Sequence, residues 1–168
     1  PLSLFIDAFI IGEGEETINN FLDVYNDPSN ENLSRKELLF KLAQVPGVYV
    51  PCFYDHIYDE NNKLSAIKTN DKVPQKVSRQ WIRDLDAYDG KTVITIENTE
   101  FNLFLIETSR GCGRHCRFCM AGYCFRKPRH RSLDKLLSYL PQAKNLNKKV
   151  GLMGPAISDY PQINELCS

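Results

Sequence analysis

Three cysteines stand close together in the second half of the 168-residue sequence. Cys112, Cys116 and Cys119 follow the spacing C-x3-C-x2-C and are half of the chain's six cysteines. Thiolates are the soft ligands that Zn²⁺ and iron–sulfur clusters select, and at this spacing they can converge on one metal centre. A 4Fe–4S cube has four irons, so three thiolates would leave one iron open to another ligand. The spacing therefore predicts a metal or cluster site.

Two other interpretations of these cysteines are open. The three positions would share one face of a helix and could be small core residues. Gly111 and Gly113 disfavour a helix there, because each glycine costs about 1 kcal/mol in a helix interior. A structural zinc site is the stronger alternative, since Cys124 or His115 could complete a tetrahedron of ligands.

The motif and its surroundings resemble the signature of the radical S-adenosylmethionine (radical SAM) enzymes, with Arg110-Gly111 before the first cysteine and Phe118 before the third. The resemblance implies that the three cysteines hold a 4Fe–4S cluster whose open iron chelates the methionine part of SAM. It implies that one electron from the cluster cleaves SAM to a 5′-deoxyadenosyl radical, which abstracts hydrogen from an unknown substrate. The aromatic residue at the place of Phe118 contacts the adenine in that family.

Residues 101–168 predict one βαβ unit around these cysteines. Residues 101–108 read as a buried strand, and the cysteine loop leaves its carboxyl end, where α/β barrels collect their chemistry. Ser132 is placed to cap a helix that Pro141 ends or kinks, and residues 149–153 read as the next strand. The unit resembles the truncated start of a partial radical SAM barrel.

The SAM-binding residues after the second strand depart from the family pattern. Radical SAM enzymes commonly place Gly-Gly-Glu there, and the glutamate meets the SAM amino group. The matching place here reads Gly151-Leu152-Met153-Gly154-Pro155, without a glutamate. Gly154 would still allow close approach of the backbone to the cofactor. Asp159 is the candidate replacement for the glutamate, and a helix N-cap near Pro161 is its structural alternative.

Residues 1–26 predict a strand, a tight turn and a helix. The apolar run 2–11 is typical of a buried strand in a parallel sheet, and apolar residues recur at helical spacing from Glu16. With the cysteine motif downstream, the segment resembles the end of the Rossmann-like, cobalamin-binding domain that precedes the barrel in one radical SAM subgroup. The cobalamin motif of that subgroup, D-x-H-x-x-G, is absent. Cobalamin is therefore possible in a longer protein and is not supported for this chain.

Residues 27–100 predict a small connecting α+β module. Ser34 and Glu37 form a capping box at the start of a helix, and residues 53–68 predict a β-hairpin. Further strands are predicted at residues 48–51, 76–85 and 92–96. The polar side chains of this region mark no site, and structural roles are expected for Cys52, Tyr54, His56 and Tyr58.

The formal net charge of zero hides an uneven distribution. Residues 1–109 hold 10 Lys/Arg and 18 Asp/Glu, a difference of −8, whereas residues 110–168 hold 11 and 3, a difference of +8. These cations would offset the negative charge of a thiolate-bound cluster and of the SAM carboxylate; RNA binding is the alternative that a basic tract permits. Seven of them crowd around the cysteines in sequence: Arg110, Arg114, Arg117, Arg126, Lys127, Arg129 and Arg131.

The sequence thus predicts an α/β radical SAM enzyme that takes electrons from a donor such as flavodoxin or ferredoxin. An RNA methylthiotransferase-like enzyme is an alternative, although the barrel of that family follows a domain with three further cysteines and only Cys52 lies upstream here. A second alternative is a non-catalytic zinc or iron–sulfur module.

The composition predicts a cytoplasmic protein without a membrane segment. No run of about 18 apolar residues is present, and clustered cysteines without a secretory signal indicate a reducing compartment. The chain opens within an apolar run and stops soon after a predicted strand, which suggests a fragment. We expect residues 1–168 alone to release no 5′-deoxyadenosine and to self-associate through an exposed strand edge.

Overall fold

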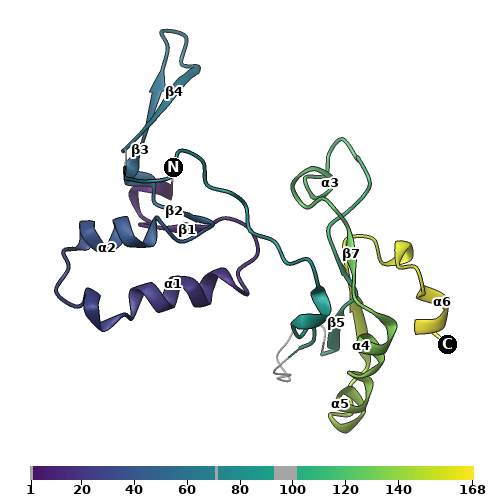
Figure 1. The fold of residues 1–168 in the computed structure, drawn as a ribbon. Coiled ribbons are helices and arrows are strands. Elements are labelled where there is room, and N and C mark those ends of the chain that lie inside the picture. Colours follow the sequence, from purple (N-terminus) through teal and green to yellow (C-terminus); the bar gives the residue numbers. More distant parts are fainter. Residues whose placement is uncertain (1, 71, 93–101) are drawn as a thin grey trace. The chain divides into compact units, whose positions relative to one another are not determined.

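The computed structural model describes residues 2–70, 72–92 and 102–168. The chain forms two compact units, residues 1–82 (unit 1) and residues 83–168 (unit 2), coloured from purple to teal and from teal to yellow in Figure 1. Each unit has a hydrophobic core of its own. The described part contains helices and two-stranded sheets, so the predicted mixture of helices and strands is confirmed. No helix in this part is long and apolar enough to cross a membrane.

In its described residues, unit 1 combines two α-helices with two small antiparallel sheets, one formed by β1 and β2 and the other by β3 and β4. Its elements are η1 (Leu2–Leu4), β1 (Phe9–Ile10), α1 (Thr17–Tyr25), η2 (Pro28–Asn30), α2 (Arg35–Leu42), β2 (Val48–Tyr49), η3 (Pro51–Phe53), β3 (Tyr54–Tyr58) and β4 (Leu64–Thr69), where η marks a short 3-10 helix.

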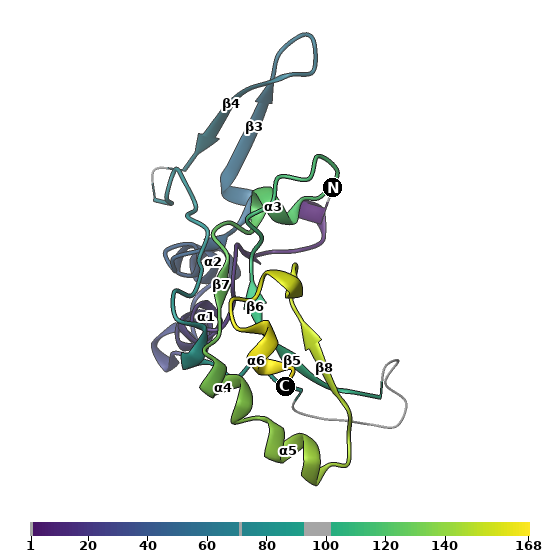
Figure 2. The same ribbon diagram turned by 90° about the vertical axis from the view of Figure 1, so that its right-hand side faces the viewer.

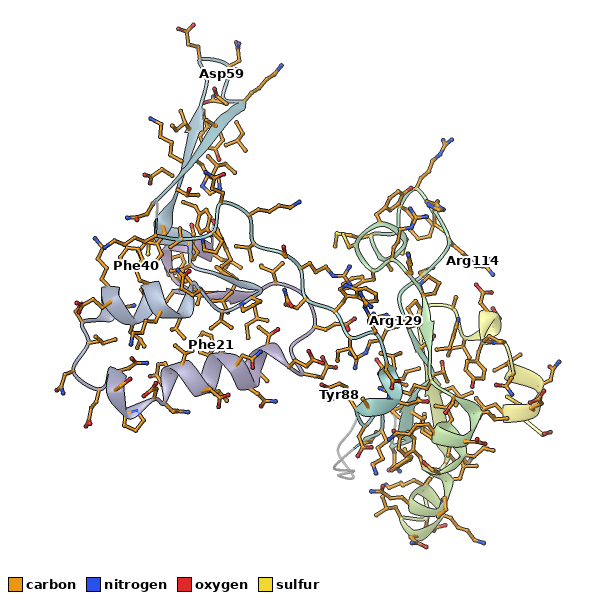
Figure 3. All side chains as sticks on the ribbon, viewed as in Figure 1. Phe21, Phe40, Asp59, Tyr88, Arg114 and Arg129 are labelled. Carbon is orange, nitrogen blue, oxygen red and sulfur yellow. The ribbon has the colours of Figure 1, made fainter. Side chains whose placement is uncertain are left out.

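The start of α2 and the hairpin form as the sequence predicts. The Ser34 hydroxyl accepts a hydrogen bond from the Glu37 backbone N–H, and the Glu37 carboxylate accepts one from the Ser34 N–H at 2.9 Å, which completes the capping box. Phe40 of α2 stacks on Phe53 with ring centroids 4.0 Å apart (Figure 3). At the hairpin tip, the Asp59 carboxylate accepts hydrogen bonds from two backbone N–H groups and so fixes the turn.

Two strand predictions in unit 1 are wrong. Residues 2–11 do not form a buried parallel strand: β1 is two residues long, it pairs antiparallel with β2, and Leu4 and Phe5 are 87% and 83% exposed. A parallel strand is buried only where other elements cover both of its faces, and within the described residues of this run only Ala8 and Ile10 pack against the core cluster of unit 1. This pairing does not support the Rossmann-like resemblance of residues 1–26.

Residues 76–85 also form no strand. Their one sheet-like contact in the described part is a bridge from Gln80 to Gly12, because Ser78, Arg79 and Gln80 interrupt the apolar pattern. The predicted strand at residues 92–96 lies outside the described residues, apart from Thr92. Helix α1 is confirmed, but only Phe21 and Val24 of its side chains pack against the core cluster of unit 1.

The described part of unit 2 holds a parallel strand pair, an antiparallel pair and four short α-helices. Its elements are η4 (Leu85–Ala87), β5 (Phe104–Glu107), β6 (Ser109–Arg110), α3 (Ala121–Cys124), β7 (Arg129–His130), α4 (Leu133–Leu137), α5 (Leu140–Asn145), β8 (Val150–Met153), η5 (Ile157–Asp159) and α6 (Ile163–Leu166).

The predicted βαβ order of unit 2 is confirmed. Strands β5 and β8 run parallel and side by side (Figure 2), in a register that ends with Glu107 opposite Met153. The Ser132 hydroxyl caps α4 by accepting from the Lys135 N–H at 3.2 Å, and Pro141 lies in the first turn of the next helix, α5. The core beneath the strands is made by Phe104, Ile106, Leu136, Tyr139, Ala143 and Tyr160. The pair is one βαβ unit, whereas a barrel needs further strands.

Candidate functional site

The cysteine loop, residues 111–128, begins just beyond the carboxyl end of β5 and is closed at its base. Strands β6 and β7 pair antiparallel and form this base, with Arg110 opposite Arg129. Gly111 has φ +83°, and a Cβ atom at this position would lie 2.3 Å from the Phe125 carbonyl oxygen. The base therefore requires glycine at position 111. The next residue, Cys112, donates its backbone N–H to the same oxygen at 3.0 Å.

The three cysteines of the motif lie in this loop as free thiols. Cys112 and Cys119 are half-buried and Cys116 is exposed. The Arg114 N–H donates to the Cys112 sulfur at 3.4 Å, and the Cys119 N–H donates to the Cys116 carbonyl at 3.0 Å in a tight turn. Over the described ranges, no three Cys, His, Asp or Glu side chains are gathered as metal ligands would be.

The alternative fourth ligands are not gathered with the motif either. Cys124 is exposed at the end of α3. The His115 ring meets the edge of the Tyr123 ring at 6.0 Å, and the Tyr123 hydroxyl donates to the His115 carbonyl at 3.4 Å. Among the described residues, neither Cys124 nor His115 lies with the three thiols in a group of side chains that could hold a metal ion.

The donor set itself suits a soft metal centre. The loop contains four thiols, one imidazole and no carboxylate, and thiolates select zinc or iron–sulfur clusters over Mg²⁺ or Ca²⁺. Phe118 is 93% exposed beside Cys119, so the face of its ring is accessible to a ligand held near the cysteines.

A cavity of about 370 Å³ opens where β5 and β8 end. Gly154 lies in its wall and is closely packed, since a Cβ atom there would lie 2.8 Å from the Ser109 hydroxyl oxygen and 3.0 Å from the Thr108 hydroxyl oxygen. The cavity is lined by Glu107, Ser109, Arg110, Gly111, Phe125, Met153, Gly154 and Pro155. It therefore joins the carboxyl end of the parallel pair to the base of the cysteine loop.

Asp159 is bound to the cysteine loop. Its carboxylate accepts two hydrogen bonds from the Arg114 guanidinium, from Nε at 2.9 Å and from Nη2 at 2.5 Å (Figure 3 labels Arg114). The hydrogen bond from Arg114 holds the pKa of Asp159 below its ordinary value, and the same bond raises the pKa of Arg114. The N-cap alternative for Asp159 is wrong, because Gln162 occupies the N-cap of the following helix, α6.

The role expected for Arg131 needs correction. The charge pattern grouped it with the cations around the cysteines, but it is 1% exposed inside unit 2. Its guanidinium donates to the carbonyl oxygens of Leu85 and Tyr88 and to the Glu107 carboxylate, the last at 2.6 Å. Arg110 donates to the other Glu107 oxygen at 2.7 Å. Charge along the sequence cannot reveal this network, because Arg131 and its partners come from distant segments.

Two opposing effects set the pKa of Glu107. Burial raises it, but the hydrogen bonds from Arg110 and Arg131, together with their positive charges, outweigh burial. The pKa of Glu107 therefore lies below its ordinary value, and the carboxylate at the end of β5 stays ionised near neutral pH.

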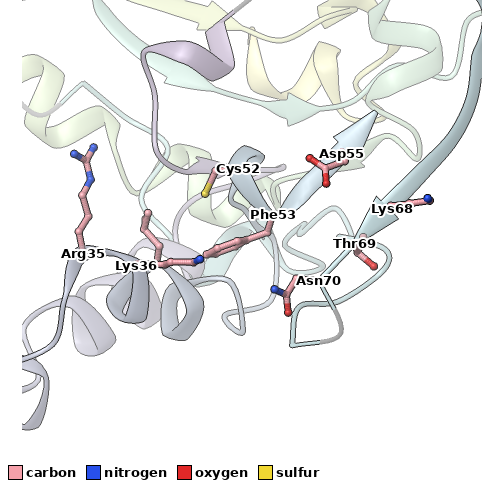
Figure 4. A pocket seen from close by; sticks show the side chains of 9 residues that line it. Arg35, Lys36, Cys52, Phe53, Asp55, Lys68, Thr69 and Asn70 are labelled. Carbon is pink, nitrogen blue, oxygen red and sulfur yellow. The ribbon is translucent and has the colours of Figure 1, made fainter. Parts of the chain in front are cut away.

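Another cavity, of about 700 Å³, lies in unit 1 and not at the cysteine loop. Figure 4 shows that its cations, Arg35, Lys36 and Lys68, do not converge on a common point. Arg35 is already paired with Asp7 at 2.5 Å. The neighbouring Tyr54 is buried and donates its hydroxyl to the Pro74 carbonyl, the structural role expected of it.

Comparison with known proteins gives two matches. Residues 1–51 match the family described as "Radical SAM proteins, N-terminal". The chain is also 32% identical, over 170 aligned residues, to an uncharacterized protein of Methanocaldococcus jannaschii. That alignment covers all of this chain and 31% of the relative, so the chain spans about a third of the relative's length. No solved structure matches the chain. The family match supports membership of the radical SAM superfamily.

Proposed function

We propose that this chain is part of a radical SAM enzyme and that Cys112, Cys116 and Cys119 hold its 4Fe–4S cluster. The observation that supports this proposal most directly is a loop with three free thiols at the carboxyl end of a parallel strand pair. The family match lies within residues 1–51 and does not include the cysteines. Two separate parts of the sequence thus support the same proposal.

Each site residue has a role in this proposal. The three thiolates would ligate three irons and leave the fourth for SAM, and the bound cluster would supply the electron for reductive cleavage of SAM. The exposed ring of Phe118 would flank the adenine, with its face available for stacking. The Gly154 backbone would face the cofactor at the cavity wall. Asp159 would contact the SAM amino group while it stays paired with Arg114.

The described structure favours neither alternative function. Among the described residues Cys124 is not gathered with the three thiols. Arg110 and Arg131 bind Glu107, and Arg114 binds Asp159. These pairings leave less uncompensated positive charge for RNA than the sequence indicates. The subgroup with a cobalamin-binding-like domain and the flavodoxin or ferredoxin donor remain predictions from the resemblance. The cytoplasmic location remains a prediction from the composition.

The test is SAM cleavage by the whole protein, purified without oxygen and reconstituted with iron and sulfide. We expect a brown protein that releases 5′-deoxyadenosine from SAM when dithionite is added, measured by chromatography and mass spectrometry. The matched control is Cys116→Ser, which should release none because it lacks a cluster ligand. A colourless, zinc-loaded protein that leaves SAM intact would contradict the proposal.

A further inference from the structure

Arg114 occupies a central position in the cysteine loop. It stands two residues after Cys112 and two before Cys116, and its N–H donates to the Cys112 sulfur at 3.4 Å. Its guanidinium binds Asp159 through two hydrogen bonds, which hold a planar side chain in one orientation better than a single bond does. Fixing Arg114 therefore restricts where both neighbouring cysteines can lie.

The partner carboxylate is on a fixed support. Asp159 precedes Tyr160, which is 3% exposed and belongs to the core of unit 2. The Tyr160 hydroxyl donates to the Arg131 carbonyl at 2.9 Å, and its ring meets the edge of the His130 ring at 5.8 Å. Asp159 is therefore held by the core and by β7, the strand at the base of the loop.

The second half of the loop rests on the same residue. Gly122 of α3 lies so close to the Arg114 carbonyl that a Cβ atom on Gly122 would be 1.9 Å from that oxygen. Helix α3 follows Cys119 directly after Met120. Arg114 is thus the point where both halves of the loop meet the segment that follows β8.

We propose that Arg114 and Asp159 are positioning residues that latch the cysteine loop to the segment after β8 before any cluster is bound. The latch limits the conformations that the loop must give up when its thiols converge. Its side chains are 61% and 40% exposed, so its effect is modest, about two- to fivefold on the opening equilibrium of the loop. The role in cluster assembly rests on the proposed function, whereas the latch itself does not.

The first test is hydrogen–deuterium exchange of the metal-free whole protein. Arg114→Gln and Asp159→Asn should each raise the exchange rate of the amides of residues 112–125 about two- to fivefold. The control is Arg117→Gln, which removes the same charge from the same loop but lacks a described carboxylate partner and should leave the rate unchanged. High salt should bring the native loop toward the rate of the variants, because it screens exposed charges.

Two further measurements separate the latch from the cluster. The charge swap Arg114→Asp with Asp159→Arg should restore part of the protection. Anaerobic iron uptake should be slower in both single variants by a similar factor, with the same final iron content as the native protein. Unchanged exchange in both single variants would overturn the latch, whatever the iron content. A latch confirmed by exchange in a protein that takes up no iron would overturn the proposed function alone.

Discussion

At the residue scale, Arg131 differs most from what its sequence context indicates. It stands in a basic tract, where an exposed cation is the usual expectation. Its partners Leu85, Tyr88 and Glu107 lie 46, 43 and 24 residues away along the chain. A buried guanidinium is stable only when such partners converge on it, and that convergence depends on the tertiary fold.

Replacing Arg131 tests this network. Arg131→Met should lower the free energy of unfolding by on the order of 3 kcal/mol, because the half-buried Glu107 carboxylate and two carbonyl oxygens lose a charged donor. Urea unfolding measures the loss. The control is Arg126→Met at an exposed position, which should change stability by no more than about 0.5 kcal/mol. Equal stabilities of the two variants would contradict the buried network.

The lowered pKa of Glu107 predicts how this stabilisation depends on pH. A carboxylate whose folded-state pKa is below its unfolded value contributes stability above the unfolded pKa and loses it as the pH falls through the folded pKa. The stability difference between the native protein and Glu107→Gln should therefore be full near neutral pH and shrink below about pH 4.3, the ordinary pKa of glutamate. Denaturant unfolding across this range measures it. A difference that stays constant into acid would show that Glu107 is not held ionised by Arg110 and Arg131.

At the element scale, local signals predicted the helices and the hairpin well. The capping box at Ser34, the cap at Ser132 and the break at Pro141 each depend on residues a few positions apart, and each is found. Strands β5 and β8 were also predicted, since their side chains alternate or run apolar. The buried parallel strand predicted for residues 2–11 is wrong, because an apolar run gives no information about which neighbouring elements will cover it.

The packing of α3 on the loop gives a prediction at this scale. In Gly122→Ala the new methyl group would press on the Arg114 carbonyl, so α3 should move away at a cost of roughly 1–3 kcal/mol. Amide exchange within residues 112–125 should become about tenfold faster. Gly113→Ala is the matched control, because its methyl group would meet only Pro128, at an ordinary 3.7 Å. Similar exchange in both variants would show that α3 does not rest on Arg114.

At the scale of the whole molecule, the chain has two separate cores, which allow a matched pair of substitutions. Leu42 in unit 1 and Leu136 in unit 2 are 3% and 0% exposed. Leucine-to-alanine changes at such positions cost about 2–5 kcal/mol. We expect Leu42→Ala to lower amide protection mainly in unit 1 and Leu136→Ala mainly in unit 2, as measured by hydrogen exchange. An equal loss across both units in each variant would contradict the division into two cores.

The candidate site was predictable only in part. Spacing predicts the three cysteines as ligands, because the ligands of one cluster can lie within a few residues of each other, and this assignment stays a prediction. The link between Arg114 and Asp159 spans 45 residues, and local sequence gives no signal for it. Resemblance singled out Asp159 as a possible SAM contact; the structure adds its attachment to the loop.

The iron and sulfide content of cysteine variants tests the three-thiolate site most directly. The whole protein and its Cys112→Ala, Cys116→Ala, Cys119→Ala and Cys124→Ala variants would be reconstituted anaerobically, analysed for iron and sulfide, and examined by electron paramagnetic resonance after reduction. The first three should lose the 4Fe–4S signal, because each lacks one of three ligands. Cys124→Ala should keep the signal and the full iron content. An equal loss of iron in Cys124→Ala would contradict a cluster with one open iron.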